Sequence, residues 1–280
     1  MAKDIRALRK RIKSFDSTLH LTGAMGLVAS SKMRKATDAM LEGRKYMKVI
    51  DGIVDDLSKC ADCKRSAYFK ENEESAVTKL IVIAGDRGLC GGYNANVFRM
   101  VRDMGDMSVV PIGKRAFDRY TNDELDDFDP DYERDYDSSE HYTYDQAMEL
   151  ANTLIEEFKA GKTSKVGIVY NKYVSILTQE PQVRWLLPLA RPSEQAQEKG
   201  IFEPDPLTLL DDIVPQYLAG TIYSLVKESF ACEVAARRMA MDSATKNATE
   251  MIDDLTLEYN RVRQGKITQE ITEIVAGAGS

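Results

Sequence analysis

The N-terminal part of the chain repeats an apolar or small residue at alternating spacings of three and four, without a skip and without a proline. The positions that carry this repeat are Ile5, Leu8, Ile12, Phe15, Leu19, Thr22, Gly26, Ala29, Met33, Ala36, Met40, Gly43, Met47, Ile50, Val54 and Leu57. An ideal helix drifts about 20° per heptad, so a seven-residue repeat of this length requires a left-handed supercoil around a partner. The pattern predicts a single helix over residues 1–60, about 90 Å long.

The C-terminal part of the chain, residues 205–280, shows a similar helical register. Its members are Met241, Ala244, Ala248, Met251, Leu255, Tyr259 and Val262. We expect Asp205 to cap this second helix, Pro206 to occupy its first position, and Pro215 to kink or restart it. Two ends that each need a helical partner pair most economically with one another.

Small residues interrupt the first seam at Thr22, Gly26 and Ala29. Small seam residues let two helix axes approach closely, whereas each glycine lowers the intrinsic stability of a helix by about 1 kcal/mol. Packing against the second helix must therefore supply the stability that helix propensity lacks in this region.

Residues 76–190 predict a small α/β domain. In order they contain a buried strand, a glycine-rich turn and a helix, then the strand SVVPIG, the helix KRAFDRY, an amphipathic helix that ends at Gly161, and the segments KVGIVYNKY and SILTQEPQVRWLLPL. This alternation of strands and helices is typical of a mainly parallel, Rossmann-like sheet. The polar stretches 66–75 and 191–203 are expected to be linkers.

Composition excludes several classes of protein. The chain has 43% apolar and 30% charged residues, as soluble globular proteins do, and its longest apolar run, LIVIA, is far too short to span a bilayer. The N-terminus lacks the apolar core of a secretory signal, which favours a bacterial cytoplasmic protein. Four cysteines in a chain of this length suggest a reducing compartment, and the pair Cys60 and Cys63 lacks the further ligands of a zinc site.

The net charge of −7 conceals a basic first 48 residues and a densely acidic stretch at 118–140. A basic arm could suit nucleic acid or anionic lipid, but no stacking aromatics are interleaved with these cations. A solvated helix face, or one that meets an acidic protein, is the alternative interpretation. The acidic stretch lacks the spacing of a calcium-binding loop and is expected to be a solvated loop.

The loop GDRGLCGG, residues 85–92, is the best candidate for a ligand site, because it joins a strand to the N-terminus of a helix. It matches neither the dinucleotide pattern nor the P-loop ending, so a tight structural turn fixed by Asp86 and Arg87 is the main interpretation. His20 and His141 are the two histidines and are poorly placed for a nucleophilic pair. We expect no catalytic residue, cofactor or metal.

Three segments make the chain resemble the gamma subunit of F-type ATP synthases. They are RIKSFDSTLHLTGAMGLVASSKMRKA, GDRGLCGGYNANVF and the C-terminal run that contains YNRVRQGKITQEITEIV. The resemblance covers nearly the whole chain and implies a mixed α+β and α/β fold, with an antiparallel coiled coil of the two terminal helices. It also implies a non-catalytic rotor shaft that couples ion flow through a membrane c-ring to ATP synthesis or hydrolysis by alternating alpha and beta subunits.

The resemblance also implies contact residues and partners. Arg263 and Gln264, with Thr268 and Glu270 nearby, match positions that contact a beta subunit, and Met25 and Arg237 match positions near the neck. The residues matching the foot, which meets the epsilon subunit and the c-ring, are Asp86, Arg87, Phe202, Glu203 and Asp205. No nucleic acid is expected, and the chain would be peripheral on the cytoplasmic side of a bacterial cell membrane, held there only through the complex.

Several positions depart from the family pattern, namely Gly23, Gly26, Pro215 and Cys232. They bear on local neck contacts and on the straightness of the shaft. Two alternatives from other classes remain at this point. One is a coiled-coil scaffold with a non-catalytic α/β domain, which could bind nucleic acid through its basic arm, and the other is a Rossmann-like enzyme with a ligand at GDRGLCGG.

Overall fold

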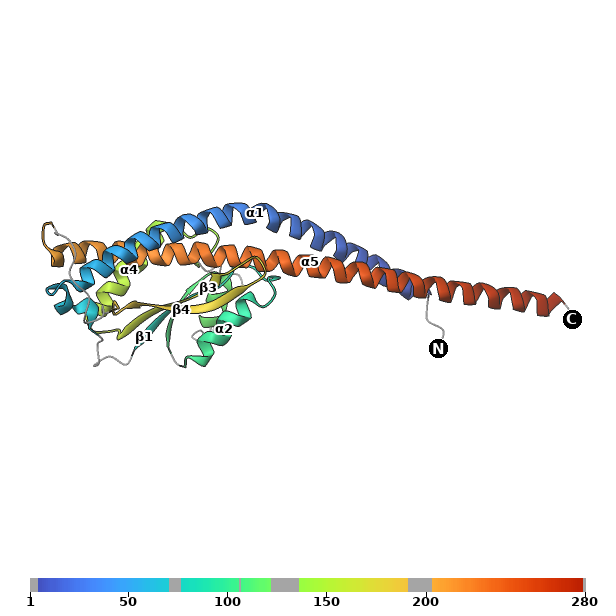
Figure 1. Ribbon diagram of the computed structural model, residues 1–280. Helices are drawn as coiled ribbons and strands as arrows, with labels where there is room; N and C mark the ends of the chain where they lie inside the picture. The colour runs from blue at the N-terminus through green and yellow to red at the C-terminus, as the bar shows by residue number, and fades with distance from the viewer. Residues whose placement is uncertain (1–4, 71–76, 106, 122–135, 191–202, 279–280) are drawn as a thin grey trace. The chain divides into compact units, whose positions relative to one another are not determined.

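The computed structural model describes residues 5–70, 77–105, 107–121, 136–190 and 203–278 (Figure 1). The chain divides into two compact units. The first, here called the coil unit, consists of Met1–Ser30 and Arg237–Ser280, and the second, the globular unit, is Ser31–Ala236. Both terminal helices pass from one unit to the other, whereas the sequence-derived domain boundaries follow the helices.

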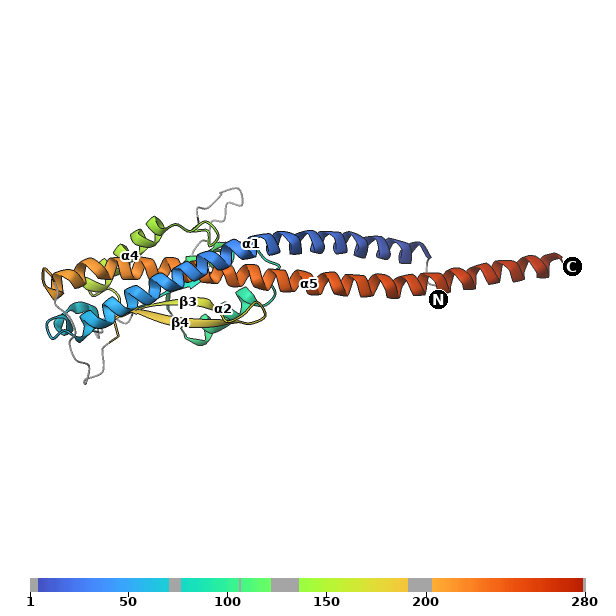
Figure 2. The same cartoon turned by 45° about the horizontal axis from the view of Figure 1, so that its top comes forward.

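Helix α1 spans Ile5–Lys59 and confirms the N-terminal prediction. Every one of the sixteen seam positions, from Ile5 to Leu57, is buried or half-buried in the structure. The seam meets α5, the long C-terminal helix Pro206–Ala278, and in the globular unit the two helices lie side by side (Figure 2). The heptad pattern therefore identified both the helix and its partner.

The start of α5 also follows the prediction. The carboxylate of Asp205 accepts hydrogen bonds from the backbone N–H groups of Leu207 and Thr208, at 3.0 Å each, and Pro206 is the first helical residue. These bonds satisfy donors that have no partner within the helix. The expected restart at Pro215 is wrong, because one helix continues through it. The side-chain amide of Gln216 donates to the carbonyl of Asp212 at 3.3 Å, next to the carbonyl of Asp211, which loses its helical donor because proline has no N–H.

The seam of α5 in the coil unit differs from the predicted one at two positions: Thr245 joins the half-buried Ala244, and Ile252 replaces Met251. Met251 is 49% exposed, and its neighbour Ile252 is half-buried in its place. The observed seam contains Met241, Thr245, Ala248, Ile252, Leu255, Tyr259 and Val262, which alternate in spacings of four and three. The hydroxyl of Thr245 donates to that of Thr22 at 2.8 Å, so the two seams meet at these residues.

Among the glycines of α1 and α5, an added Cβ would meet the opposite long helix most closely at Gly43 and Gly220 in the globular unit, and less closely at Gly26. A Cβ atom added at Gly26 would meet Asp242 and Met241 at 3.6 Å, an ordinary contact distance. At Gly43 it would meet Ser224 at 3.0 Å, and at Gly220 it would overlap the ring of Tyr46 at 2.0 Å. Glycine is therefore needed for close packing at 43 and 220 and not at 26.

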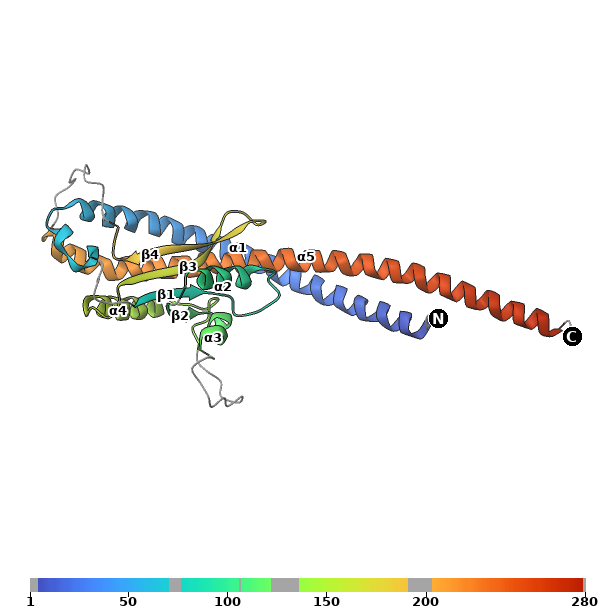
Figure 3. The same cartoon turned by 90° about the horizontal axis from the view of Figure 1, so that it is seen from below.

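The globular unit contains a four-stranded sheet in the order β2-β1-β3-β4 (Figure 3). The strands are β1 (Thr78–Ile83), β2 (Ser108–Ile112), β3 (Lys165–Tyr173) and β4 (Gln179–Leu187). Strands β1–β2 and β1–β3 are parallel, as predicted, but β3 and β4 form an antiparallel hairpin rather than continuing the alternation of strands and helices. The helices of this sheet are α2 (Tyr93–Asp103), α3 (Lys114–Tyr120) and α4 (Tyr144–Lys159).

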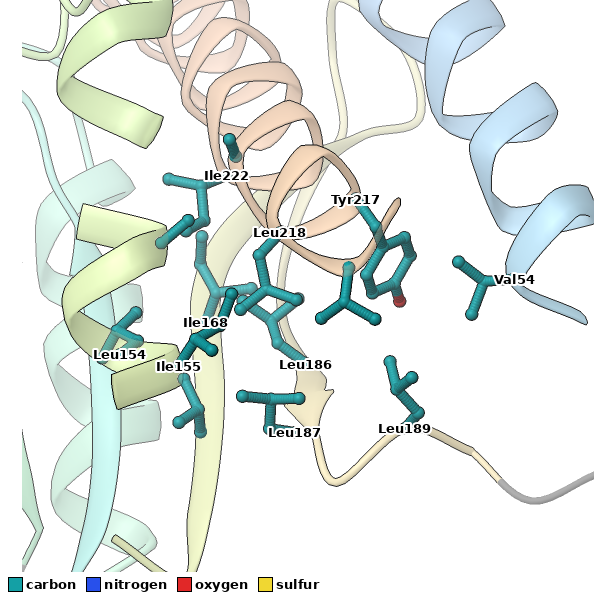
Figure 4. Packing of buried hydrophobic residues seen from close by; sticks show 14 of the residues in the cluster. Val54, Leu154, Ile155, Ile168, Leu186, Leu187, Leu189, Tyr217, Leu218 and Ile222 are labelled. Atoms are coloured by element: carbon teal, nitrogen blue, oxygen red, sulfur yellow. The ribbon is translucent and has the colours of Figure 1, made fainter. Parts of the chain in front are cut away.

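Alternate residues of β1 enter two different cores. Ile81 and Ile83 face a large cluster built with α4, α1 and α5, part of which is shown in Figure 4. Leu80 and Val82 face a smaller cluster built with α2 and α3. A strand buried on both faces requires the continuous apolar run LIVIA that the sequence has here.

Helix α4 has a capping motif at its start and the predicted glycine just beyond its end. Thr143 and Gln146 form a reciprocal capping box at its start. Gly161, just beyond its end, has φ of 76°, which glycine adopts without strain. At the edge strand β4, the indole of Trp185 covers Gly167 of β3, where an added Cβ would come within 2.9 Å of the ring.

The described part of the expected linker 66–75 is folded. Cys63–Arg65 and Ala67–Phe69 form short 3₁₀ turns, and the side chains of Tyr68 and Phe69 are buried in the large cluster. The expectation of a polar linker is therefore wrong at these two residues. The rest of that linker (71–75), most of the acidic stretch (122–135) and the linker 191–202 lie outside the described residues.

Candidate functional site

The glycine-rich loop between β1 and α2 is organised by the carboxylate of Asp86. This carboxylate accepts four hydrogen bonds, from the Ser138 hydroxyl at 2.7 Å and from the backbone N–H groups of Lys114, Ser139 and Glu140 at 3.1 to 3.2 Å. The donors belong to the first turn of α3 and to the segment before α4. Asp86 therefore joins three segments of the globular unit, beyond fixing its own turn.

A side chain of α5 packs against Gly85, the first residue of this loop. The buried carboxylate of Glu233 lies against Gly85, where an added Cβ would come within 2.6 Å of it. The backbone N–H of Gly85 donates to the side-chain oxygen of Asn94 at 2.9 Å. A phosphate would meet a negative charge here and no lysine of P-loop type, so the loop has the chemistry of a structural turn.

The residues next to this loop form a small buried cluster. Cys90, Tyr93 and Cys232 pack together, and the Tyr93 hydroxyl donates to the carbonyl of Ser229 at 3.0 Å. Burial first, and then the neighbouring charge of Glu233, raise the pKa of Tyr93 well above its usual value. The thiol of Cys232 donates to the carbonyl of Asn171 at 3.2 Å, so this departure from the family pattern is accommodated by a bond to β3.

A charged clamp joins α1, α5 and β3 within the globular unit. Arg44 of α1 donates to the carboxylate of Glu228 of α5 at 2.7 Å and to the carbonyl of Tyr173 at 2.6 Å. The same carboxylate accepts the backbone N–H of Tyr173 at 2.9 Å. The hydrogen bond to Glu228 raises the pKa of Arg44. Sequence reasoning missed this clamp, because nothing local connects residues that are 184 positions apart.

The far end of α5 presents the residues expected to contact a beta subunit. Arg263, Gln264, Thr268 and Glu270 are all exposed, as is every residue from 263 to 277. Thr268 donates to the carbonyl of Gln264 at 3.0 Å, and Lys266 lies 3.9 Å from Glu270. Large apolar side chains are exposed on the same stretch, namely Ile267, Ile271, Ile274 and Val275.

The other predicted contact residues are dispersed. Met25 and Arg237 are half-buried in the coil unit. Arg87 is exposed on the glycine-rich loop, Glu203 and Asp205 are exposed at the start of α5, and Phe202 lies outside the described residues. Glu203 and Asp205 are near one another because they are two positions apart in the chain.

The cysteines and histidines considered as candidate reactive groups do not form a reactive site among the described residues. Cys60 and Cys63 are buried free thiols, and Cys63 donates to the carbonyl of Pro206 at 3.3 Å. Burial, followed by the neighbouring Cys60, raises the pKa of Cys63 to about 12, so its thiol is a poor nucleophile at neutral pH. His20 and His141 are exposed and belong to different units. Among the described residues, no group of three or more metal-ligating side chains is assembled.

None of the described helices combines the length and the apolar character that crossing a bilayer demands.

Comparison with known proteins agrees with this arrangement. A sequence model of the family described as ATP synthase matches residues 4–280. The ATP synthase gamma chain of Ruminococcus albus is 39% identical, with 97% of this chain and 96% of the relative covered. The sodium-ion-specific gamma chain of Acetobacterium woodii is 38% identical, with 99% of both chains covered.

Solved structures share the fold. A chain of the Euglena gracilis mitochondrial ATP synthase, from a structure of OSCP, F1 and the c-ring, superposes with a TM-score of 0.65 at 18% identity, covering 98% of this chain and 93% of that one. A chain from the rotor of the same synthase gives 0.62, also at 18% identity, with 94% and 98% covered.

The fold defines a class of protein in which two long helices pack together beside a small mixed four-stranded sheet. The chain belongs to the ATP synthase gamma chain family, the central rotor stalk of F-type ATP synthases. As a gamma subunit it is a non-catalytic part of the F1 sector of the F1Fo complex.

Proposed function

We propose that the exposed end of α5 turns within a ring of alternating alpha and beta subunits. The observation that carries this proposal is the stretch 263–277, where a regular helix continues with every side chain exposed. Isolated helical stretches of this length are marginal in water, and Ile267, Ile271, Ile274 and Val275 would remain wet. A surrounding sleeve supplied by other subunits would cover these side chains.

In this proposal, Arg263 and Gln264 contact a beta subunit, and Thr268 and Glu270 lie beside that contact. Their side chains are exposed, and the contacts of Thr268 and Glu270 are with residues of their own helix. Met25 and Arg237 would lie at the neck of the shaft and affect the coupling between rotation and catalysis. The apolar residues that follow give a bearing with few directional bonds, which suits sliding.

The globular unit is proposed as the foot that meets the epsilon subunit and the c-ring. Arg87, Phe202 and Glu203 would make direct contacts there. Asp86 and Asp205 would act by holding their segments in shape, because both carboxylates are used by internal donors. The complex would thereby hold the chain at the cytoplasmic face of a bacterial membrane and couple ion flow to ATP synthesis or hydrolysis.

Transmission of torque requires that foot and shaft move as one body. The Arg44–Glu228 clamp and the close packing of Tyr46 on Gly220 join α1 to α5 within the globular unit, and the clamp also holds β3. These bonds support a stiff connection between the sheet and the helices.

The test is reconstitution of the full chain with the alpha, beta and epsilon subunits and the membrane sector with its c-ring in sealed vesicles, comparing the wild type with the double variant Arg263→Ala, Gln264→Ala. We expect the wild type to join the complex, and the double variant to assemble but to couple ATP hydrolysis to ion pumping less well. The control is Lys246→Ala, an exposed change elsewhere on α5. Full pumping by the double variant would show that these two residues do not make the contact.

A coiled-coil scaffold with a non-catalytic α/β domain is the second candidate. The exposed basic side chains near the start of α1, such as Arg6, Lys10 and Arg11, favour it. This candidate requires DNA binding with a steep dependence on salt, whereas the rotor proposal requires none.

A further inference from the structure

One surface of the globular unit gathers three tyrosines and a lysine from three helices. Tyr46 comes from α1, Tyr144 is the first residue of α4, and Tyr223 and Lys227 lie one turn apart on α5. We call these four residues the tyrosine–lysine surface. Tyr46 neighbours Tyr144, Tyr144 contacts Tyr223, and Tyr223 contacts Lys227.

Hydrogen bonds and ring contacts connect the members of this surface. The ring of Tyr46 lies against Gly220, and its hydroxyl donates to the carbonyl of Gln216 at 3.3 Å. Burial, followed by the adjacent Tyr144, raises the pKa of Tyr46. The rings of Tyr144 and Tyr223 meet edge to face at 6.1 Å, and the Lys227 ammonium lies 5.0 Å from the centre of the Tyr223 ring.

The aromatic part of the surface remains open. Tyr46 is 39% exposed and Tyr144 is 38% exposed. Tyrosine is enriched at protein interfaces because its ring buries apolar area at a low entropic cost while its hydroxyl still bonds. Three of them in one patch, positioned by buried helices, are pre-organised for contact.

Lys227 is the unusual member, since its charge has no carboxylate partner among the described residues. Its half-buried ammonium donates to the carbonyl of Tyr142 at 2.7 Å and otherwise faces the Tyr223 ring. Burial is the single cause that lowers the pKa of Lys227. By contrast, Arg44 and Lys32 of the same unit each pair with a glutamate, Glu228 and Glu140.

A half-buried ammonium of this kind is stabilised by an opposite charge that completes its surroundings. A single carboxylate from a partner chain would supply that opposite charge to the Lys227 ammonium. A nucleic acid or an anionic membrane would need a group of cations, whereas Lys227 is the one cation of this surface.

We propose that the tyrosine–lysine surface docks an acidic segment of another subunit, whose Asp or Glu carboxylate pairs with the Lys227 ammonium. This inference rests on the proposed function, because the partner is a subunit of the same complex. Tyr46, Tyr144 and Tyr223 provide the apolar rim that excludes water from that ion pair.

The test uses the intact, assembled complex and a zero-length carbodiimide. The reagent activates a carboxylate, the Lys227 amine attacks it, and an isopeptide bond forms as the reagent leaves as a urea. Mass spectrometry should recover a peptide that joins Lys227 to an Asp or Glu of another subunit. The variant Lys227→Arg keeps the charge but should lose this cross-link, while cross-links at other lysines persist.

A second measurement follows retention of subunits on dilution. Lys227→Met and Tyr144→Ala should each weaken retention of the cross-linked subunit by about 10-fold, the scale of a central interface residue. The matched control is Lys172→Met, at an exposed lysine of β3. Lys227 found free of cross-links in an active complex, or unchanged retention in Lys227→Met, would overturn this proposal alone. Failure of the chain to assemble at all would overturn the proposed function with it.

Discussion

Helix α5 is one continuous helix with two opposite environments. In the globular unit, most of its side chains from Val214 to Ala235 are buried, whereas every side chain from 263 to 277 is exposed. Leu218 and Ile222 are fully buried, yet Ile274 is 70% exposed. A residue's position in a helix therefore does not show how much it contributes to the free energy of unfolding. The first stretch is held by its own fold, and the second is a regular helix that awaits contacts from other chains.

The largest effect is expected at a turn of the globular unit. Gly113 has φ of 90°, and a Cβ there would lie 2.0 Å from the carbonyl oxygen of Ala84, a backbone atom that cannot rotate away. Gly113→Ala should cost about 4 kcal/mol or prevent folding. Gly105→Ala is the matched control, because Gly105 has the same φ but open space around it, and it should lose only about 1 kcal/mol. Urea denaturation of both variants measures the difference, and equal losses would contradict the clash.

A second comparison places one substitution in both environments of α5. Ile222→Ala should lower the free energy of unfolding by about 2 to 5 kcal/mol, because it opens a cavity in the large core. Ile274→Ala removes the same atoms from an exposed site and should change stability by less than about 0.5 kcal/mol in the free chain. Thermal unfolding of the two variants checks this, and a comparable loss from Ile274→Ala would mean that the exposed end is already packed.

The charged clamp gives an intermediate effect. Arg44→Met leaves the buried carboxylate of Glu228 without its counter-charge and should destabilise the chain by about 2 kcal/mol. The double variant Arg44→Met, Glu228→Gln should recover part of that loss, since no unpaired buried charge remains. A double-mutant cycle measured by urea denaturation gives the coupling, and additive losses would show that the two side chains act independently.

The smallest effect concerns the cap of α5. Hydrogen bonds from Thr208 first, and then from Leu207, lower the pKa of Asp205. A carboxylate with a lowered folded-state pKa contributes stability that is present above about pH 4 and is lost as the pH falls through the folded pKa. Asp205→Asn should therefore differ most from the wild type near neutral pH, with the difference shrinking in acid. Urea titrations across this range would contradict the assignment if the gap stayed constant.

The sequence predicted the two long helices well because their signals are repetitive and local. Seam positions along α1, the cap at Asp205 and the glycine after α4 all follow from spacing or from the conformation of one residue. The choice between Met251 and Ile252 did not follow, because both are apolar and only the packing of α5 on α1 decides which one is buried.

Long-range features were beyond the reach of local patterns. Tyr68 and Phe69 sit among polar neighbours, so their burial could not be read from periodicity. The Arg44–Glu228 clamp and the tyrosine–lysine surface depend on residues brought together by the fold. Of the proposed contact residues, exposure at the end of α5 agrees with the resemblance, while their partners stay a prediction.

The indole that covers Gly167 has a practical consequence. Trp185 is the single tryptophan of the chain and belongs to β4 in the globular unit, whereas the coil unit has none. Its fluorescence emission therefore reports the melting of the sheet and is blind to the coil unit, while far-ultraviolet circular dichroism follows the helices of both. Overlaying the two melting curves separates a cooperative chain from one that loses its coil first.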